Sequence, residues 1–263
     1  MKVNPYLPVK AMVLEVIRQN ENVSTFKIAA GGLKPAPGQF MEVSIPRVGE
    51  CPVSISDFDS KQIELTIRNV GKVTSAISAL KKGDCLFVRG PYGNGFPLDR
   101  FKDKRLVMVL GGIGLVPVKG IIKHYYKNDH EIKGLDLLAG FRNPREIIFQ
   151  DELNRWQEKF KVLITVDEDS EGWRGRTGFV SELVKEINIG KQDVAIVVGP
   201  VPMIKAAVGE LMKQEMDKDN IWVSYERRMS CGIGKCGHCR VNDQYVCLDG
   251  PVFNYQKAET LID

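Results

Sequence analysis

Four cysteines near the C-terminus have a spacing that is typical of redox chemistry. They are Cys231, Cys236, Cys239 and Cys247, in the pattern C-x4-C-x2-C-x7-C. The spacing of the first three matches plant-type [2Fe–2S] sites, in which thiolates bind the iron. The glycines between them allow positive φ angles, which turn backbone N–H groups toward sulfur. The loop therefore predicts a [2Fe–2S] cluster.

Other interpretations of these cysteines remain open at this point. A zinc site also uses four thiolates, but it usually has two C-x2-C-like pairs well apart in the sequence. Two disulfides would require an oxidising compartment, and buried structural thiols are a further alternative. His238 could replace a thiolate, as histidines do in Rieske centres, although four cysteines already complete a ligand set.

Composition indicates a globular chain of one large or two ordinary domains. The chain has 263 residues, of which 43% are hydrophobic and 27% charged, with a net charge of +4. Basic and acidic residues are interleaved, so we expect no nucleic-acid partner. No apolar run approaches the ~20 residues that span a bilayer, and the N-terminus lacks the apolar region of a secretory signal. We expect a cytoplasmic protein without membrane contact, which argues against disulfides.

Residues 9–100 predict short strands separated by glycine and proline turns. In the first strand, Met12, Leu14 and Val16 share one face of a two-residue repeat. A single helix is expected at 72–80. Six strands with one helix predict a closed Greek-key barrel. The expected strands are 10–18, 23–29, 40–45, 53–56, 63–68 and 84–89.

Two stretches of this barrel suggest ligand contact. The strand Val53-Ser54-Ile55-Ser56 carries small hydroxyls. The segment 69–74 joins a strand to a helix through Gly71, and a helix N-terminus offers free N–H groups that suit a phosphate.

From residue 104 the pattern changes to alternating strands and helices. Short apolar runs are typical of buried parallel strands, so the sequence predicts an open doubly wound sheet. The expected strands are 106–110, 135–141, 162–166, 194–198 and 221–225. The expected helices follow Pro117 to about residue 127 and cover 145–159, 178–187 and 202–217.

A glycine-rich turn follows the first strand of this second region. Gly112, Ile113, Gly114 and Pro117 stand where a doubly wound fold seats a pyrophosphate, although the third glycine of the Rossmann fingerprint is missing. Gly199, Pro200 and Pro202 follow another strand and are expected at the same carboxyl edge. A hydrolytic triad is not evident, and the histidines are few: His124, His130 and His238.

Together these motifs resemble the ferredoxin–NADP reductase superfamily over nearly the whole chain. The resemblance rests on Val53-Ser54, on 69–74, on Gly90-Pro91-Tyr92-Gly93-Asn94-Gly95-Phe96, and on the two glycine motifs. It implies an FAD-binding barrel at 1–100, an NAD-binding α/β domain at 101–226 and a [2Fe–2S] segment at 227–263. The cysteine loop narrows the likeness to a branch that holds electron-transfer subunits of dihydroorotate dehydrogenase, sulfhydrogenase and anaerobic sulfite reductase. Glu226 to Cys239 is most like the last two, and 245–255 favours the sulfite reductase subunit.

The resemblance also implies roles for single residues. Ser54 is the expected catalytic contact near flavin N5. Cys51 and Val53 replace the arginine and tyrosine of the family's flavin motif, so Arg68 or Arg47 is expected to supply the missing charge. The implied FAD contacts are Cys51, Pro52, Val53, Ser54, Ile67, Arg68, Gly71, Lys72, Val73 and Thr74.

The acidic stretch Asp167-Glu168-Asp169 bears on the choice of nicotinamide. Family members that use NADPH hold its 2′-phosphate with Ser and Arg after the third strand. Carboxylates repel that phosphate and accept hydrogen bonds from a free 2′-hydroxyl. We therefore expect NADH rather than NADPH, with Asp167 as a contact.

The resemblance implies an NAD(P)H-dependent flavoprotein oxidoreductase. NADH passes hydride to FAD, and single electrons leave through the cluster. The expected partners are an iron–sulfur electron-transfer subunit and a sirohaem-type catalytic subunit of a reductase that converts sulfite to sulfide. The alternative is a subunit of a sulfhydrogenase or a dihydroorotate dehydrogenase. From another class, a zinc-binding, flavin-free interaction module remains open, and Cys51 in place of arginine favours it.

Overall fold

A computed structural model describes residues 4, 6–169 and 172–261, which form two compact units. The first, called the barrel unit here, comprises Met1–Phe96, Val116–Gly120 and Glu226–Pro251. The second, called the sheet unit, comprises Pro97–Leu115, Ile121–Tyr225 and Val252–Asp263. The cysteine loop thus belongs to the barrel unit, whereas residues 252–261 belong to the sheet unit.

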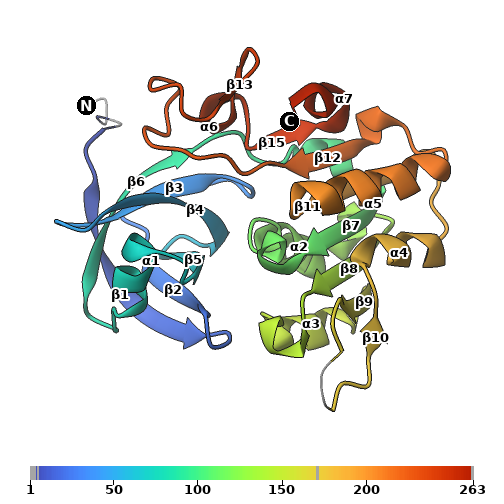
Figure 1. The fold of residues 1–263 in the computed structure, drawn as a ribbon, viewed down its shortest axis with the longest axis horizontal. Coiled ribbons are helices and arrows are strands. Elements are labelled where there is room, and N and C mark those ends of the chain that lie inside the picture. The colour runs from blue at the N-terminus through green and yellow to red at the C-terminus, as the bar shows by residue number, and fades with distance from the viewer. Residues whose placement is uncertain (1–3, 5, 170–171, 262–263) are drawn as a thin grey trace. The chain divides into compact units, whose positions relative to one another are not determined.

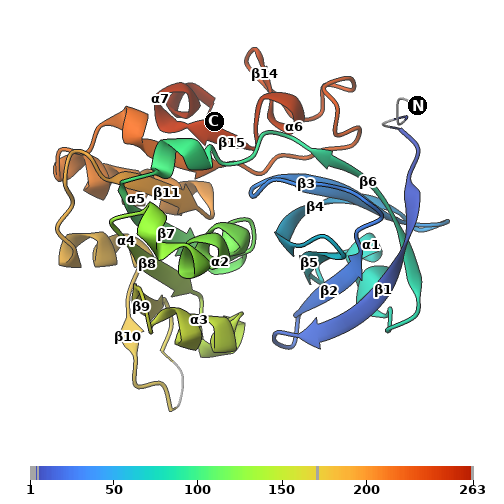
Figure 2. The same ribbon diagram turned by 180° about the vertical axis from the view of Figure 1, so that it is seen from behind.

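The barrel unit contains the predicted closed barrel. All neighbouring strands are antiparallel, in the order β1-β2-β5-β4-β3-β6 (Figures 1 and 2). One helix, α1 (Lys72–Ser78), follows β5. The predicted six-stranded fold is confirmed, and most strand limits agree within a few residues. The strands are β1 (Val9–Arg18), β2 (Val23–Ala29), β3 (Phe40–Ile45), β4 (Gly49–Phe58), β5 (Gln62–Arg68) and β6 (Cys85–Tyr92).

The barrel core is apolar. In the first strand, the residues that face this core are not the ones that the sequence pattern grouped together. Ala11 and Val13 are buried, whereas Met12 is 48% exposed. The pairing of β1 with β2 shifts between Val13 and Glu15, so an irregularity interrupts the two-residue repeat on which the prediction depended. Met12, Leu14 and Val16, which the repeat placed on one face, therefore differ in burial: Met12 is exposed, whereas Leu14 and Val16 are half-buried.

The sheet unit is the predicted doubly wound sheet, with strand order β10-β9-β8-β7-β11-β12-β15. Its pairs are parallel except the last, β12 with β15. Helices α2 and α3 cover one face, and α4 and α5 cover the other (Figures 1 and 2). The strands are β7 (Arg105–Gly111), β8 (Gly134–Phe141), β9 (Lys161–Val166), β10 (Arg176–Thr177), β11 (Val194–Val198), β12 (Ile221–Ser224) and β15 (Val252–Asn254).

Several helices are shorter than the sequence predicts. The expected helix 145–159 is a 3-10 turn (Pro144–Glu146) followed by α3 (Gln150–Trp156), because Phe149 takes a left-handed φ of 57° between them. Helix α5 (Val201–Lys213) ends four residues before the expected limit at 217, because the backbone of Glu215 takes a left-handed φ of 65°. The others are α2 (Lys119–Lys127) and α4 (Val180–Leu183).

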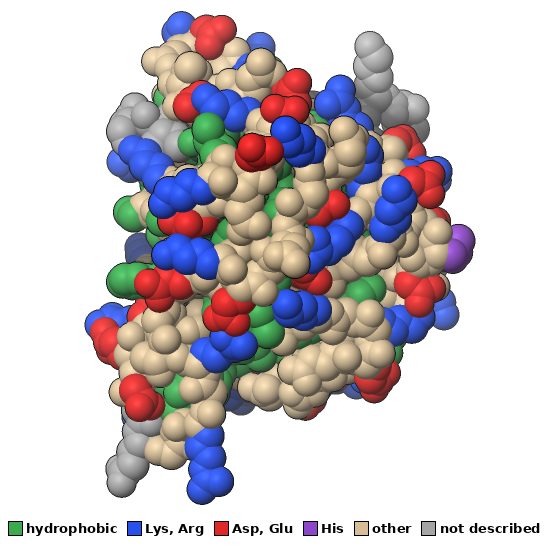
Figure 3. Space-filling view, turned by 90° about the vertical axis from the view of Figure 1, so that its right-hand side faces the viewer, with side chains coloured by type: hydrophobic (Ala, Val, Ile, Leu, Met, Phe, Trp, Pro, Cys, Tyr) green, Lys and Arg blue, Asp and Glu red, His purple; other side chains and the backbone are tan. Residues whose placement is uncertain are grey.

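The C-terminal segment contains small elements that the sequence did not predict. A two-stranded ribbon and a short helix stand in the cysteine region, and a further short helix follows β15. They are β13 (Arg240–Val241), β14 (Gln244–Tyr245), α6 (Val246–Asp249) and α7 (Tyr255–Ala258). In the described ranges, every helix is too short or too polar to cross a membrane. Figure 3 shows one face of the molecule, on which basic and acidic side chains are interspersed.

Candidate functional site

The cysteine loop has a backbone that is shaped around sulfur. Gly232, Gly234 and Gly237 have φ angles of 73°, 68° and 81°, which L side chains rarely adopt. Through these turns, Cys231 Sγ accepts hydrogen bonds from the N–H groups of Ile233 at 3.5 Å and Lys235 at 3.3 Å. Cys247 Sγ accepts one from Gly234 at 3.1 Å. Such donors stabilise the negative charge of thiolates and of bound iron–sulfur clusters.

The four thiols stand as two pairs. The Cys231 thiol helps to lower the pKa of Cys236, and the Cys239 thiol helps to raise that of Cys247, so each thiol has one interacting neighbour. Cys239 and Cys247 are each 1% exposed, whereas Cys236 lies at the surface. In the described part of the chain, no three His, Cys, Asp or Glu side chains converge on one ion position. Four thiols grouped as two neighbouring pairs fit a group that carries two metal centres.

Local environment affects the two pairs differently. The backbone N–H of His238 is the main cause that lowers the pKa of the Cys236 thiol. Burial raises the pKa of Cys247 to about 12, and the neighbouring Cys239 adds to this rise. Metal coordination deprotonates a thiol outright, so the buried pair suits a metal rather than a free thiolate.

The loop is fixed to strand β6 and the turn after it. Gly232 packs on Tyr92, because a Cβ added at Gly232 would lie 2.8 Å from the ring. Farther along the loop, the Asn94 side chain donates to Asp249 O at 2.9 Å and its N–H donates to Gly250 O at 2.6 Å. Both ends of the loop are therefore attached to the same short stretch of barrel.

Three charged side chains surround the start of the loop. Arg89 is 8% exposed and Glu42 is 1% exposed. Glu50 forms an ion pair with Arg89 at 2.6 Å. Burial raises the pKa of Glu42 to about 7, opposed by the positive charge of Arg89, and Glu42 Oε1 has no hydrogen-bond partner within the described residues. Nothing in the sequence pattern marked these residues, because they lie far from the cysteines along the chain.

Strand β4 divides the expected flavin residues between two faces. Val53 packs in the barrel core with Ile67, and Cys51 packs against that core. Pro52 and Ser54 alternate with them and are half-buried. Arg68 ends β5 and is also half-buried, whereas Arg47 is exposed in a turn with a φ of 67°. Val53 is thus a core side chain, and Ser54 is directed toward the opposite face.

The expected phosphate loop is an exposed, capped turn. Gly71 is the N-cap of α1, and Thr74 Oγ1 accepts from the N–H groups of Val70 at 3.0 Å and Gly71 at 2.9 Å. Lys72 is exposed and Val73 half-buried. Thr74 therefore fixes the turn that precedes the helix. The N–H groups of the first helical turn have no acceptor within the helix and can bind a phosphate.

Burial should make Cys51 a slowly reacting thiol. Its pKa is raised from 9.0 to about 11 by burial and, to a lesser extent, by the carboxylates of Glu42 and Glu50. Because of this higher pKa, the fraction of thiolate at pH 8 is about a hundredfold smaller than for an ordinary thiol. Only the thiolate reacts, so the reaction rate should fall in proportion. We expect alkylation by iodoacetamide, followed by peptide mass spectrometry, to be slower at Cys51 by about this factor in the native than in the unfolded chain. Equal rates would contradict this assignment.

In the sheet unit, the two glycine motifs meet at the point where the strand order reverses. Strand β7 starts the sheet, and β11 lies on its other side, so their carboxyl ends flank the switch point. A Cβ at Gly199 would lie 3.3 Å from Gly111 Cα, and a Cβ at Gly114 would overlap the carbonyl of Val198. Gly112 has a φ of 54°. The glycines themselves contribute only backbone at this edge, and the Met203 side chain packs against Gly111 and Gly199.

The remaining expected nucleotide residues lie around this edge or near it. Ile113 is half-buried and Pro117 is buried ahead of α2, while Pro200 and Pro202 are exposed at the start of α5. Tyr225 follows β12, and its buried hydroxyl has no hydrogen-bond partner in the described ranges. An unpaired buried hydroxyl beside a glycine-lined edge fits a polar cofactor.

The acidic stretch after β9 is exposed and close to a cation. Arg142 forms an ion pair with Glu168 at 3.4 Å. Burial, with Glu168 adding to it, raises the pKa of Asp167, while Arg142 lowers it. Both side chains are largely exposed, so this ion pair is weak, but the carboxylates place negative charge beside Arg142, where a 2′-phosphate would bind.

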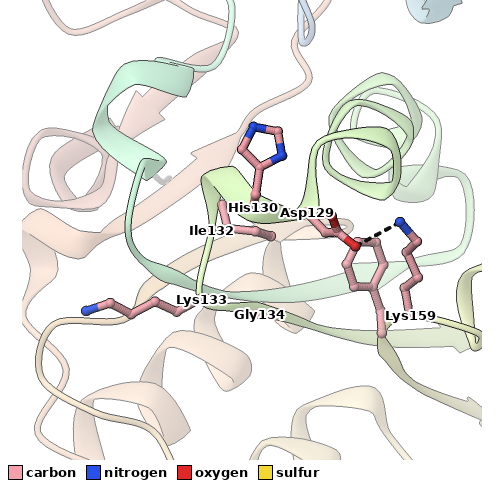
Figure 4. A pocket seen from close by; sticks show the side chains of 7 residues that line it. Asp129, His130, Ile132, Lys133, Gly134 and Lys159 are labelled. Carbon is pink, nitrogen blue, oxygen red and sulfur yellow. Dashed lines mark hydrogen bonds and ion pairs between the residues drawn. The ribbon is translucent and has the colours of Figure 1, made fainter.

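A separate hollow of about 360 Å³ lies at the opposite end of β8, beside Gly134. Figure 4 shows the ion pair of Asp129 and Lys159 at this hollow, 2.8 Å apart, with His130 and Lys133 around it. The two charges satisfy one another, and the amino ends of the strands are not where open α/β folds bind ligands. This hollow is therefore not part of the candidate site.

Comparison with known proteins matches both halves of this description. Residues 108–209 match the oxidoreductase NAD-binding domain family, and residues 226–259 match the iron–sulfur cluster binding domain of dihydroorotate dehydrogenase B. The sulfhydrogenase 1 gamma subunit of Pyrococcus furiosus is 34% identical over 96% of this chain and 92% of its own length. The probable dihydroorotate dehydrogenase B electron transfer subunit of Thermococcus kodakarensis is 34% identical over 95% and 93%.

Solved structures show the same architecture. An NADH-dependent reduced ferredoxin-NADP oxidoreductase has a TM-score of 0.78 and 25% identity, over 94% of this chain and 88% of that one. The cytochrome b5 reductase domain of Ulva prolifera nitrate reductase has a TM-score of 0.71 at 20% identity, over 84% and 98%, and so shares the fold. The family matches and the ferredoxin-NADP oxidoreductase structure confirm the predicted cofactor set of FAD, NADH and an iron–sulfur cluster. The chain belongs to the ferredoxin–NADP reductase-like family of NAD-dependent electron-transfer subunits that end in an iron–sulfur domain of the dihydroorotate dehydrogenase B type.

Proposed function

We propose that this protein oxidises NADH through FAD and delivers single electrons, through a [2Fe–2S] cluster, to a partner subunit. The observation that carries the proposal is the cysteine loop: two neighbouring pairs of thiols, with N–H donors aimed at sulfur, fixed to the barrel of a reductase fold. When bound, FAD accepts hydride and releases electrons singly, and the cluster accepts one electron at a time.

The chain's own residues bind and orient these groups. The switch-point glycines Gly112, Gly114 and Gly199, with Ile113, Pro117, Pro200 and Pro202 around them, would let the pyrophosphate of NADH approach backbone N–H groups. Ser54 would hydrogen-bond near the reacting nitrogen of the flavin. The first turn of α1, from Gly71 through Lys72 and Val73 to Thr74, would meet the FAD phosphates. Pro52 and Arg68 are the other side chains proposed to contact FAD. Cys51, Val53 and Ile67 face the barrel core, so we propose that they contact FAD through their backbone.

Arg68 is our candidate for the charge that the flavin motif lacks at Cys51. It ends β5 immediately before the 69–74 turn, whereas Arg47 lies exposed in the β3–β4 turn. Proximity along the chain to the proposed phosphate loop favours Arg68. We further propose that 1–100, 101–226 and 227–263 serve as the flavin, nicotinamide and cluster domains, and that the protein acts in the cytoplasm.

The terminal acceptor is proposed from the relatives. Sulfite reduction, the first expectation from the sequence, receives no support from the relatives described above. Their names are those of sulfhydrogenase and dihydroorotate dehydrogenase electron-transfer subunits, so the alternative has better support. We propose that the chain serves an enzyme of one of these kinds, on a separate subunit, and that a sirohaem-type partner is the weaker candidate.

Anaerobic purification tests the proposal directly. We expect FAD, and iron and acid-labile sulfide at about two atoms each per chain, as a [2Fe–2S] cluster requires. NADH should bleach the flavin and then the cluster absorbance. Zinc in place of iron, with no flavin, would overturn the proposal in favour of the interaction module. Subunits that co-purify from the native source would identify the acceptor.

Coenzyme preference gives a further prediction. We expect kcat/KM for NADH to exceed that for NADPH by about tenfold or more, which is about 1.4 kcal/mol of transition-state binding. Replacing Asp167→Asn together with Glu168→Gln should reduce this ratio, because it removes two carboxylates and leaves Arg142 for the 2′-phosphate. Asp151→Asn, on α3, is the control and should leave the ratio unchanged. Equal use of both nucleotides by the unaltered protein would refute the preference.

A further inference from the structure

The guanidinium of Arg89 connects the barrel with the start of the cysteine loop. Arg89 lies on β6, 142 residues before Cys231 in the chain. Its Nη1 donates to Cys231 O, and its Nη2 donates to Ser230 O at 2.9 Å. Cys231 is the first of the four thiol residues, so Arg89 holds the backbone that places this thiol.

The other donors of Arg89 hold the guanidinium itself in place. Nε donates to Glu50 Oε1 at 2.9 Å, and Nη2 donates to Glu50 Oε2 at 2.6 Å, a two-point contact. Nη1 also reaches Tyr92 Oη at 3.4 Å. A guanidinium has five N–H donors in a fixed plane, and all five are used here. Lysine could not reproduce this set, because its three donors radiate from one point.

The Arg89 side chain is 8% exposed and that of Glu50 is 28% exposed, so solvent screens their charges only partly. Reduction adds one negative charge to an iron–sulfur cluster. A nearby cation stabilises the reduced form, and a nearby carboxylate destabilises it. Glu50 therefore opposes Arg89, and the potential depends on the balance of the pair.

We propose that Arg89 is a positioning residue for the cysteine loop and that the Arg89–Glu50 pair sets the reduction potential of the cluster. The part that concerns the potential rests on the proposed function, because it requires a bound cluster. The positioning role does not, because it concerns contacts within the barrel unit alone. Neither residue touches the thiol sulfurs in the described contacts, so both act through the loop backbone and through their charges.

Redox titration of the cofactor-loaded protein, followed by electron paramagnetic resonance, tests the charge role. Arg89→Gln should shift the midpoint potential to more negative values, and Glu50→Gln should shift it to more positive values. The double variant should fall between the two, because both charges are gone. Arg89→Lys should keep the potential closer to that of the unaltered protein but lose iron faster. A purely structural role would not produce shifts of opposite sign, so unchanged potentials in both single variants would overturn this part.

Hydrogen–deuterium exchange tests the positioning role, with or without a bound cluster. Arg89→Gln should speed exchange of the amides of residues 230–236, whereas Arg105→Lys, a change to an ion-paired arginine in the sheet unit, should not. Unchanged exchange in Arg89→Gln would overturn the positioning role. Absence of iron from the unaltered protein would instead refute the proposed function, and the exchange result would still decide whether Arg89 positions the loop.

Discussion

Cys236→Ser is expected to abolish electron delivery to the partner while NADH-to-dye activity persists. Serine is a poor iron ligand, because its hydroxyl does not ionise near neutral pH. Mutation of a residue that only supports a metal ligand typically lowers metal affinity or activity by about 10–100-fold. Loss of a ligand itself should therefore reduce electron transfer by more than about a hundredfold. Cys236 is exposed, and its replacement leaves no cavity in the core. Iron and sulfide analysis and two parallel activity assays measure the outcome.

The matched control for this change is Cys85→Ser. Cys85 is half-buried in β6, in the barrel wall and outside the loop. The control should retain iron, sulfide and both activities. If Cys236→Ser eliminated dye reduction as well as transfer, separate flavin and cluster sites would be refuted. If it retained the cluster, the assignment of Cys236 as a ligand would be wrong.

Gly114→Ala is expected to destabilise the sheet unit and to weaken NADH binding. An added Cβ would overlap Val198 O and lie 2.8 Å from the carbonyl carbon, and this backbone belongs to the central strand β11. Forced overpacking typically costs about 1–3 kcal/mol, and a strand at the middle of a sheet cannot move away cheaply. Denaturant unfolding measures the loss of stability, and titration with NADH measures the loss of affinity.

Gly209→Ala is the matched control, because it makes the same chemical change in the same unit. Gly209 lies inside α5, and a Cβ there would meet no atom within 4 Å. Alanine favours a helix over glycine by up to about 1 kcal/mol, so this variant should be more stable than the unaltered protein. Two variants that shift stability in the same direction would contradict the account of Gly114.

The fold was predictable because its strongest signals are local. The runs 106–110 and 194–198 are apolar throughout, as buried parallel strands require, and the glycine motifs follow them directly. The order of strands then places those motifs at the switch point. Spacing alone likewise indicated the four cysteines, since loop geometry depends on residues that are near in sequence.

Features that depend on distant contacts could not be predicted. The left-handed backbone at Phe149 divides an expected helix, although its local pattern is helical. Arg89 and Glu50 meet the cysteine loop only after the barrel has closed, so their sequence neighbourhood carries no signal of that role. The acceptor was not settled by the sequence either: residues 245–255 favoured sulfite reductase, whereas the relatives described above are named as sulfhydrogenase and dihydroorotate dehydrogenase subunits.

The pairing of β12 with β15 has a consequence for how the segment that carries the cysteines could be exchanged. Ser224 lies opposite Val252, so the chain leaves the sheet and re-enters it at adjacent positions. An insertion with neighbouring ends can be lengthened, trimmed or exchanged at little topological cost, because loop closure entropy rises only slowly with length. The segment between these strands, residues 225–251, is therefore an insertion with adjacent ends. Chimaeras joined at Ser224 and Val252 should fold when the new segment keeps the contacts to Arg89 and Asn94.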